Sequence, residues 1–298
     1  GGYSKAILKF PDTKVFAIDR DKLTNKYANV LEKKFPRRFN FFQEKFSNLN
    51  QIAPSNLNPK AIIFDLGLSS FQLSDKQRGF SFESKNFLNM EMGINDYSTY
   101  DVINSLDKEQ LGLIIKIFGE EKEGKRIANE IDKHRRKQPI KNSKELALIV
   151  KKAKRKDISY KKNPATKTFQ AIRIFVNKEL SELTSGLIAA TKLLSNGGIL
   201  IVVSFHSIED RIVKNFFNFH SNIKSNPSRY LPAKENKSNL FKTVCKKVLL
   251  PTSNEINENP RSRSAKLRYA VRNNNLFTNP EEFQKMFLNY LELESASI

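Results

Sequence analysis

Two polar segments follow apolar runs at positions where an α/β protein carries its chemistry. Ser204-Phe205-His206-Ser207 comes directly after the apolar run Ile199–Val203, and Asp65 follows the run Ala61–Phe64. Loops at the carboxyl ends of parallel strands bind ligands in wound sheets. The groups there that are suited to accepting a proton or orienting a substrate are Asp65, Ser69, Ser204 and His206.

Both segments also have purely structural interpretations. Ser207 is predicted to cap the next helix, with Asp210 three residues later completing a capping box. Asp65 and Ser69 are equally typical of a turn followed by a helix cap. We expect the capping box to form and the residues before it to face a ligand site.

A glycine pair opens the chain, and an acidic residue follows about 18 residues later. Gly1-Gly2 precedes a predicted helix, and Asp19 lies in the apolar run Lys14–Asp21. This spacing is typical of sites for adenosine-containing cofactors, whose ribose hydroxyls bind the carboxylate. Because such a turn normally follows a strand, we expect that the first, central strand of the sheet is missing from this chain.

The apolar runs predict a parallel sheet covered by helices on both faces. The runs are Lys14–Asp21, Phe39–Leu49, Ala61–Ser70 and Ile199–Ser204. Thr166–Ser195 is predicted as one long amphipathic helix. Phe241–Leu250 and Ser264–Arg272 are predicted as a terminal antiparallel pair joined without a helix. We therefore predict an α/β protein with a methyltransferase-type Rossmann fold.

Residues 95–163 show no strand pattern and predict an inserted all-helical subdomain. The rest of the chain, residues 1–94 and 164–298, is predicted to form the main domain. Within the insertion, Lys116–Lys162 has 17 Lys and Arg against 7 Asp and Glu. Solvated helix faces and phosphate binding both explain this excess, and we expect the subdomain to bind RNA.

The whole chain is strongly basic, with 52 Lys and Arg against 31 Asp and Glu and a net charge of +21. A compositional preference for lysine does not explain the deficit of acids, so a polyanionic partner, nucleic acid, is expected. The candidate RNA-binding residues are Arg135, Arg136, Arg173, Arg261, Arg263 and Lys266. For the last three, a solvated edge that discourages aggregation is the alternative.

Composition excludes several other classes. No apolar run approaches the roughly 20 residues of a membrane span, and no basic amphipathic anchor stands out. Cys245 is the only cysteine and the chain has three histidines, so neither an intrachain disulfide nor a metal site is expected. A cytoplasmic protein is expected.

One stretch has more large apolar side chains than a linker needs. It carries Phe71, Phe80, Phe82 and Phe87 among polar residues, and their spacing fits neither a helix nor a strand. It is either a loop whose aromatic rings hold a base or local core under a long loop.

Four stretches resemble one known family in order and nearly word for word. They are DLGLSSFQLSDKQRGFSF, ATKTFQAIRIFVNKELSEL, SFHSIEDRIVKNFF and NPRSRSAKLR. The chain resembles, from Gly1 to about Arg272, the RsmH (MraW) family of bacterial S-adenosylmethionine-dependent methyltransferases. These enzymes modify the N4 amine of a cytidine in 16S rRNA at the decoding centre.

The resemblance implies a set of residues around S-adenosylmethionine. Asp19 would bind the ribose hydroxyls, Phe46 would lie near the adenine, and Asp65 and Gln72 would lie toward the methionine end and the target base. Tyr3 stands where the family has histidine, after Gly1 and Gly2. The implied partner is 16S rRNA in the small ribosomal subunit, with a homodimer left open.

The chemistry implied by the resemblance requires a hydrogen-bond acceptor for a poorly nucleophilic amine. The sequence has no Pro-Pro loop of the kind other amine methyltransferases use. We expect Asp65 to be the acceptor first and His206 second, with the base unstacked to reach them. A nicotinamide-dependent oxidoreductase and a non-catalytic RNA-binding protein are the two alternative functions.

Overall fold

The chain divides into two compact units, each assembled from segments distant in sequence. The computed structural model describes residues 1–154, 163–221, 239–245, 247–277 and 281–296. Unit 1 comprises Gly1–Phe46, Leu68–Leu180 and Tyr290–Ile298, and unit 2 comprises Ser47–Gly67 and Ser181–Asn289. The predicted division at residues 94 and 164 stays a prediction.

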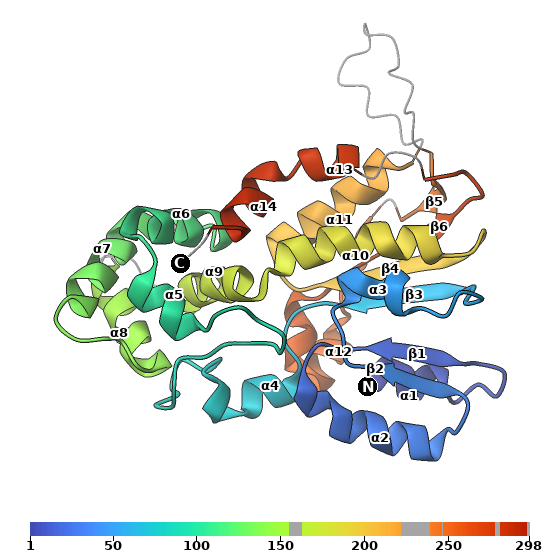
Figure 1. Cartoon of the computed structure of the whole chain (residues 1–298), viewed down its shortest axis with the longest axis horizontal. Coiled ribbons are helices and arrows are strands. Elements are labelled where there is room, and N and C mark those ends of the chain that lie inside the picture. Colours follow the sequence, from blue (N-terminus) through green and yellow to red (C-terminus); the bar gives the residue numbers. More distant parts are fainter. Residues whose placement is uncertain (155–162, 222–238, 246, 278–280, 297–298) are drawn as a thin grey trace, which may run out of the picture. The chain divides into compact units, whose positions relative to one another are not determined.

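Unit 1 begins with a small α/β layer. Its elements are α1 (Gly2–Ile7), β1 (Val15–Ile18), η1 (Lys22–Thr24), α2 (Asn25–Lys34) and β2 (Phe39–Phe42), and β1 pairs in parallel with β2. Ala28 and Leu31, one helical turn apart on α2, bury against Leu8 and Phe39. This contact fixes the helices against the strand pair that carries Asp19 at its end (Figure 1).

The rest of unit 1 is helical. Its elements are α4 (Ser70–Ser74), η3 (Lys76–Arg78), α5 (Thr99–Ser105), α6 (Lys108–Phe118), α7 (Gly124–Arg135), α8 (Ser143–Ala153) and α9 (Thr166–Asn177). Helix α6 packs against α7 and α9. The approach of α6 and α7 is close because Gly124 has no side chain: a Cβ there would lie 2.8 Å from the carbonyl oxygen of Gly112. Between residues 95 and 154 the named elements are all helices, and residues 155–162 of the predicted basic segment lie outside the described residues.

Unit 2 contains a four-stranded mixed sheet. Its strands β3 (Ala61–Asp65), β4 (Ile199–Ser204), β5 (Phe241–Val244) and β6 (Lys266–Arg272) lie in the order β3-β4-β6-β5. Strands β3 and β4 are parallel, whereas β6 is antiparallel to both β4 and β5. Helix α11 (Ser207–Phe219) packs on this sheet, and α3 (Leu49–Ile52) and α13 (Glu281–Lys285) also belong to the unit. The predicted combination of parallel strands with a terminal antiparallel pair is confirmed.

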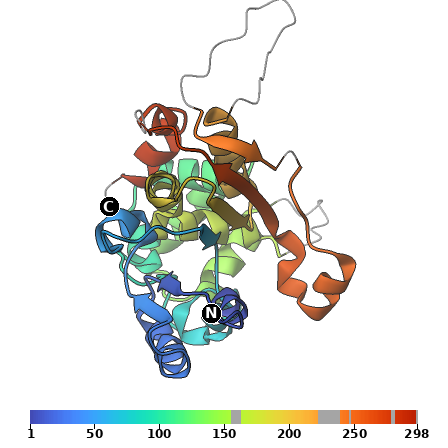
Figure 2. The ribbon, with the colours of Figure 1, turned by 90° about the vertical axis from the view of Figure 1, so that its right-hand side faces the viewer.

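The sheet differs from the prediction in two respects. The described strands form two separate hydrogen-bonded ladders, β1-β2 and β3-β4-β6-β5, rather than one wound sheet. The connection from β5 to β6 contains α12 (Ser253–Glu258) and η4 (Pro260–Ser264), which the prediction of a helix-free link missed. Thr252 caps α12 by accepting from the Glu255 amide at 3.2 Å. Figure 2 shows this orange segment extending away from the strands it joins.

The predicted single helix Thr166–Ser195 is wrong, because two helices, α9 and α10 (Glu179–Leu193), replace it. Lys178 separates them with a left-handed backbone, φ 49° and ψ 43°. The buried Asn177 side chain accepts from the Met92 amide at 2.8 Å and donates to the Met90 carbonyl at 3.0 Å. These contacts with a distant loop hold the end of α9 in place, so tertiary bonding overrides the continuous helical pattern.

Three of the described elements cross the sequence boundaries of the units: η2 (Phe46–Asn48), α10 and α14 (Leu288–Glu294). Within the described ranges of the chain, each helix is too short or too polar to span a lipid bilayer.

Candidate active site

In unit 2, Asp65 and Ser204 end neighbouring parallel strands at the same edge of the sheet. Asp65 pairs in register with Val203, and the Leu66 amide donates to the Val203 carbonyl at 3.0 Å. The two loops that follow are in contact: Gly67 has a φ of 82°, and a Cβ there would lie 3.2 Å from the Phe205 ring. The predicted edge with two adjoining loops is therefore present.

The Asp65 carboxyl is the available acceptor at this edge. It is open to solvent on one side, and in the described part of the chain it has neither a hydrogen bond nor an ion pair. The protein atoms around it partly desolvate the carboxyl and raise its pKa above the ordinary value of 3.8. A nearby cation or N–H donor would stabilise the charged form of such a carboxyl.

Ser204 and His206 are more constrained than Asp65. Ser204 is 2% exposed, and its hydroxyl donates to the Lys266 carbonyl at 3.4 Å. His206 is the N-cap of α11, where its Nδ1 accepts from the Glu209 amide at 3.4 Å and its Nε2 lies 3.3 Å from Glu209 Oε1. The imidazole is therefore oriented by Glu209.

The capping box of α11 forms one residue earlier than predicted. Glu209, which is 2% exposed, accepts from the Phe205 amide at 2.8 Å and from the His206 amide at 3.3 Å. His206 and Glu209 thus replace the predicted Ser207 and Asp210. The Asp210 carboxylate instead pairs with Arg268 on β6 at 2.7 Å and with Lys266 at 3.4 Å.

Asp210 is strongly held by these cations. Burial alone would raise the pKa of its carboxyl, but the hydrogen bond and charge of Arg268, with help from Lys266, lower the pKa below the ordinary 3.8. The charge of Lys266, a predicted RNA contact, is thereby partly balanced. Arg261 and Arg263, on η4, are exposed.

In unit 1, a buried carboxylate links two of the predicted cofactor residues. Asp19 Oδ1 accepts from the Asp21 amide at 2.9 Å, and Asp21 Oδ2 accepts from Gln72 Nε2 at 2.7 Å. Burial, supported by the nearby charge of Asp21, raises the pKa of Asp19 above 3.8. Asp21 is 2% exposed and also pairs with Arg78. Asp19 and Gln72 therefore belong to one polar cluster centred on Asp21.

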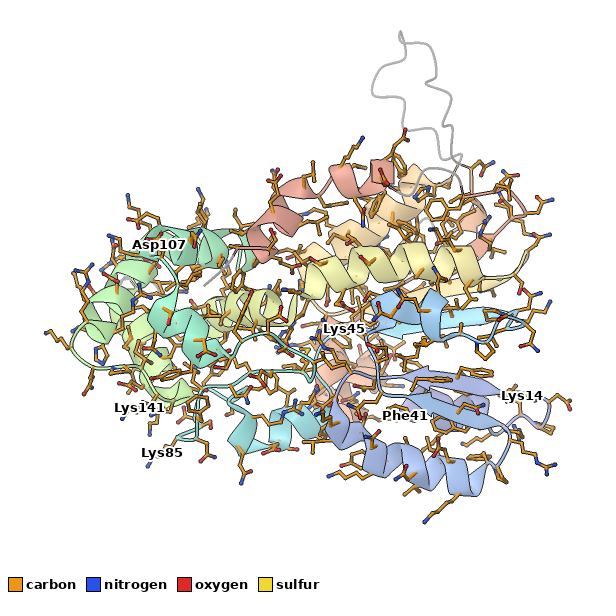
Figure 3. All side chains as sticks on the ribbon, in the orientation of Figure 1. Lys14, Phe41, Lys45, Lys85, Asp107 and Lys141 are labelled. Carbon is orange, nitrogen blue, oxygen red and sulfur yellow. The ribbon has the colours of Figure 1, made fainter. Side chains whose placement is uncertain are left out.

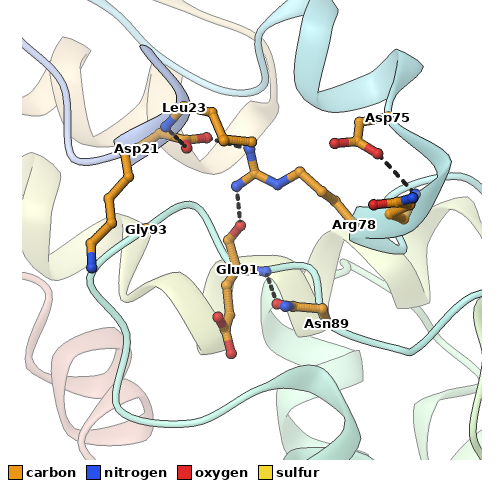
Figure 4. A pocket seen from close by; sticks show the side chains of 9 residues that line it. Asp21, Leu23, Asp75, Arg78, Asn89, Glu91 and Gly93 are labelled. Atoms are coloured by element: carbon orange, nitrogen blue, oxygen red, sulfur yellow. Dashed lines mark hydrogen bonds and ion pairs between the residues drawn. The ribbon is translucent and has the colours of Figure 1, made fainter. Parts of the chain in front are cut away.

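A cavity of about 280 Å³ lies beside this cluster and is bordered by Asp21, Arg78 and Glu91. Figure 4 shows the Arg78 guanidinium reaching from Asp21 to the backbone of Glu91, whose carbonyl accepts from Arg78 Nη2 at 2.5 Å. The same guanidinium lies 5.5 Å from the centre of the Phe80 ring. These contacts connect Arg78, on one wall of the cavity, to Asp21, Glu91 and Phe80.

The other predicted cofactor residues and Ser69 lie at helix starts. Gly1 is the N-cap of α1, Tyr3 is 46% exposed, and Phe46 begins η2. Ser69, a predicted catalytic residue, caps α4 by accepting from the Gln72 amide at 3.3 Å, and Gln72 Oε1 accepts from the Ser69 amide at 2.9 Å. Ser69 thus serves to place Gln72.

Three predicted RNA-binding arginines in unit 1 are paired with carboxylates. Arg135 and Arg136 both contact Asp132, at 3.0 and 2.8 Å, and Arg173 makes a two-pronged contact with Glu179 at 2.7 and 2.8 Å. Arg136 remains exposed, whereas Arg173 is largely enclosed.

Asp21, Arg78 and Glu209 were missed as functional candidates. Asp21 follows Asp19 by two residues and Arg78 lies inside the DKQRGF segment, so the acid pair and the motif were signals for both. Glu209 was not predicted because Ser207 and Asp210 form an equally good capping pattern one residue after His206 and Glu209.

The fold and the strand edge define an α/β protein with an unpaired carboxyl among the described residues, that of Asp65, where two neighbouring parallel strands end. A family model described as the MraW methylase family matches residues 1–273, and the chain belongs to that family. The chain is 44% identical over 271 residues to a protein of Ehrlichia canis, covering 90% of this chain and 89% of that protein. It is 45% identical over 274 residues to one of Wolbachia pipientis, covering 90% and 88%, and both relatives are named Ribosomal RNA small subunit methyltransferase H.

Proposed function

We propose that this protein transfers a methyl group from S-adenosylmethionine to the N4 amine of a cytidine in the decoding region of 16S rRNA. Membership of the MraW methylase family and relatives named as small-subunit rRNA methyltransferases support methylation of this RNA. The net charge of +21 supports a polyanionic substrate. The observation that carries the proposal is the unpaired Asp65 carboxyl at the parallel strand edge.

The donor set suits S-adenosylmethionine. Asp65 offers a carboxyl with no cation paired to it in the described residues, which favours a positively charged sulfonium nearby. Asp19 has one oxygen engaged by the Asp21 amide, and its second oxygen is available to ribose hydroxyls. We assign Gly1, Gly2, Tyr3, Phe46 and Gln72 to the same cofactor. When bound, S-adenosylmethionine supplies an electrophilic methyl group.

Asp65 is the proposed acceptor at the target amine. The N4 lone pair of cytosine is delocalised into the ring, so a hydrogen bond from N4–H to a carboxylate favours the pyramidal, nucleophilic nitrogen. Asp65 then takes the proton that N4 loses as the N–C bond forms. Orientation of the amine supplies up to about 7–11 kcal/mol of the barrier reduction. His206, fixed by Glu209, is the proposed positioning residue for this loop.

The test compares wild-type protein with Asp65→Asn in transfer of tritiated methyl groups to small-subunit rRNA. Asp12→Asn is the matched control, because Asp12 is an exposed acid without a hydrogen bond or ion pair in the part of the chain that the structure describes. We expect a loss of at least about 100-fold for Asp65→Asn, the scale of one proton-transfer group, and no change for the control. Wild-type rates in Asp65→Asn would remove the role of this carboxyl.

Calorimetry with S-adenosylmethionine separates this proposal from the other functions. Binding of RNA without binding of S-adenosylmethionine would support a non-catalytic RNA-binding protein. Binding of a nicotinamide dinucleotide in its place would support an oxidoreductase.

A further inference from the structure

The aromatic stretch between Phe71 and Phe87 divides into core residues and one exposed ring. Phe80 is 7% exposed, and Phe82 packs edge-on against Phe169 with ring centres 4.8 Å apart. Phe87 is 53% exposed. Local core therefore explains Phe80 and Phe82 and leaves Phe87 unexplained.

The Phe87 ring is supported from one side only. Its neighbour is Tyr100, with ring centres 5.1 Å apart and ring planes 31° from parallel. Tyr100 is itself held by its amide, which donates to the Leu88 carbonyl at 2.8 Å. The Phe87 ring thus lies against the Tyr100 ring, whose backbone is hydrogen-bonded to Leu88, and more than half of the accessible surface of Phe87 meets solvent.

The loop that carries Phe87 is anchored to the start of α8. The Leu88 amide donates to the Lys141 carbonyl at 3.0 Å, and the Lys144 amide donates to the Ser84 carbonyl at 3.0 Å. Leu88 itself is fully buried. Because the loop is hydrogen-bonded on both sides of Phe87, its backbone is ordered before any ligand binds, which lowers the entropic cost of binding.

Two exposed lysines belong to the two paired segments at the ring: Lys85 precedes Phe87 by two residues, and Lys141 precedes Asn142, which forms an antiparallel bridge with Phe87. Lys85 and Lys141 are exposed, neither forms an ion pair among the residues described, and Figure 3 shows them near each other in unit 1. The nearby acids are Glu83 and Glu145. Glu145 is occupied, since its carboxylate accepts from the Lys141 amide at 3.0 Å and lies 3.3 Å from His134 Nε2. Because neither Lys85 nor Lys141 is paired with a carboxylate in the described residues, both charges are available to an anion.

We propose that Phe87, with Lys85 and Lys141, forms a binding site for a single-stranded segment of RNA, in which an unpaired base stacks on Phe87 and the lysines contact its phosphates. An exposed aromatic ring beside cations is the arrangement that binds unpaired nucleotides, because every base offers a π face and every nucleotide a charge. Paired bases are covered by their neighbours in a duplex and are excluded. This proposal rests on the proposed rRNA substrate. It adds that the Phe87 surface binds an unpaired segment of that RNA.

The first test uses the absence of tryptophan from the chain. Phe87→Trp gives this chain a single indole at the site, and Phe10→Trp, at a ring 67% exposed in the same unit, is the control. Stacking of a base quenches indole fluorescence. We expect a 12-nucleotide unstructured RNA to quench Phe87→Trp saturably and to leave Phe10→Trp unchanged. Equal quenching of both variants, or none in Phe87→Trp, would overturn the proposal.

The second test measures affinity by fluorescence anisotropy with the same RNA and with a duplex of equal length. Phe87→Ala should weaken binding of the single strand by about 5-fold or more, since stacking on one ring contributes that much or more, and should spare the duplex. Replacing Lys85 and Lys141 by Ala should lower the slope of log affinity against log salt by about 1.4, at roughly 0.7 for each lost phosphate contact. Lys33→Ala, at an exposed lysine on α2, is the charge control.

These measurements do not depend on catalysis. Unchanged affinity in Phe87→Ala, or an equal loss for single strand and duplex, overturns the stacking site even if the wild-type protein methylates rRNA. Failure of the proposed function would appear separately, as absence of methyl transfer by a wild-type protein that still binds the oligonucleotide through Phe87.

Discussion

Replacement of Asp21 by asparagine tests the cluster that links the two predicted cofactor residues of unit 1. The Asp21 carboxylate accepts from Gln72, Arg78 and the Leu23 amide, and only 3% of its side chain is exposed. Asparagine keeps the shape but removes the charge, and its amide nitrogen presents hydrogens to the Arg78 guanidinium. The side chain of Arg78 is 13% exposed, so the substitution leaves a largely buried cation without its anion.

Loss of one partner of a buried ion pair costs about 3–5 kcal/mol. Arg78 keeps its bond to the Glu91 carbonyl at 2.5 Å, which places the expected loss at the lower end, about 3 kcal/mol. For a cooperative unit of about 150–250 residues, 1 kcal/mol shifts the unfolding midpoint by about 2–4 °C, so we expect a decrease of roughly 6–12 °C.

Circular dichroism during heating measures this midpoint for wild type, Asp21→Asn and the exposed control Asp12→Asn. Arg78→Met in the Asp21→Asn background removes the stranded cation, so the double variant should lose less than the sum of the two single losses. A midpoint for Asp21→Asn within 1–2 °C of wild type, or strictly additive losses, would show that Asp21 and Arg78 do not form the buried pair.

Three further predictions concern carboxyls of unit 2 and their dependence on pH. Asp210→Asn should destabilise the protein by about 3 kcal/mol at neutral pH, because Arg268 loses its partner. The folded-state pKa of Asp210 lies below 3.8, so the stability difference between wild type and Asp210→Asn should be complete above pH 3.8 and should shrink below it. Urea unfolding midpoints of the two proteins are compared at pH 6 and at pH 3. The same difference in midpoint at both pH values would contradict this prediction. Asp65 has a raised pKa, so methyl transfer should fall on acidification at a pH above 3.8. Folding partly removes the charged Asp65 carboxylate from water, which costs free energy. Asp65→Asn should therefore unfold at a higher urea concentration than wild type at pH 7, and this difference should vanish below pH 3.8. A lower urea midpoint for Asp65→Asn at pH 7 would show that the carboxylate is not desolvated.

Local patterns predicted the strands well because burial of apolar runs leaves a strong signal. The runs around Val15, Ala61 and Ile199 and the alternating run before Arg272 all became strands, and Asp65 lies at a strand end as expected. The errors arose where distant contacts decide the outcome. Asn177 ends α9 through bonds to the backbone of Met90 and Met92, which no helical period reveals.

The candidate site shows the same division between local and distant determinants. Asp65 and the loop of Ser204 could be predicted as site candidates because each directly follows an apolar run that forms a strand. The choice between two overlapping capping patterns depended on Asp210, whose carboxylate is taken by Arg268 of β6, leaving Glu209 to close the helix end. The pairing of Arg135 and Arg136 with Asp132 is a local determinant, because it follows from helical spacing, three and four residues along α7.

The measurement that addresses the central claim most directly is the identity of the product. Small-subunit rRNA lacking modifications is incubated with the protein and S-adenosylmethionine, digested to nucleosides and analysed by mass spectrometry. We predict N4-methylcytidine at a single cytidine of the decoding region, formed by wild type and lost in Asp65→Asn. Methylation of another base, or of a ring carbon or sugar oxygen, would contradict the assignment of Asp65 as acceptor for an exocyclic amine.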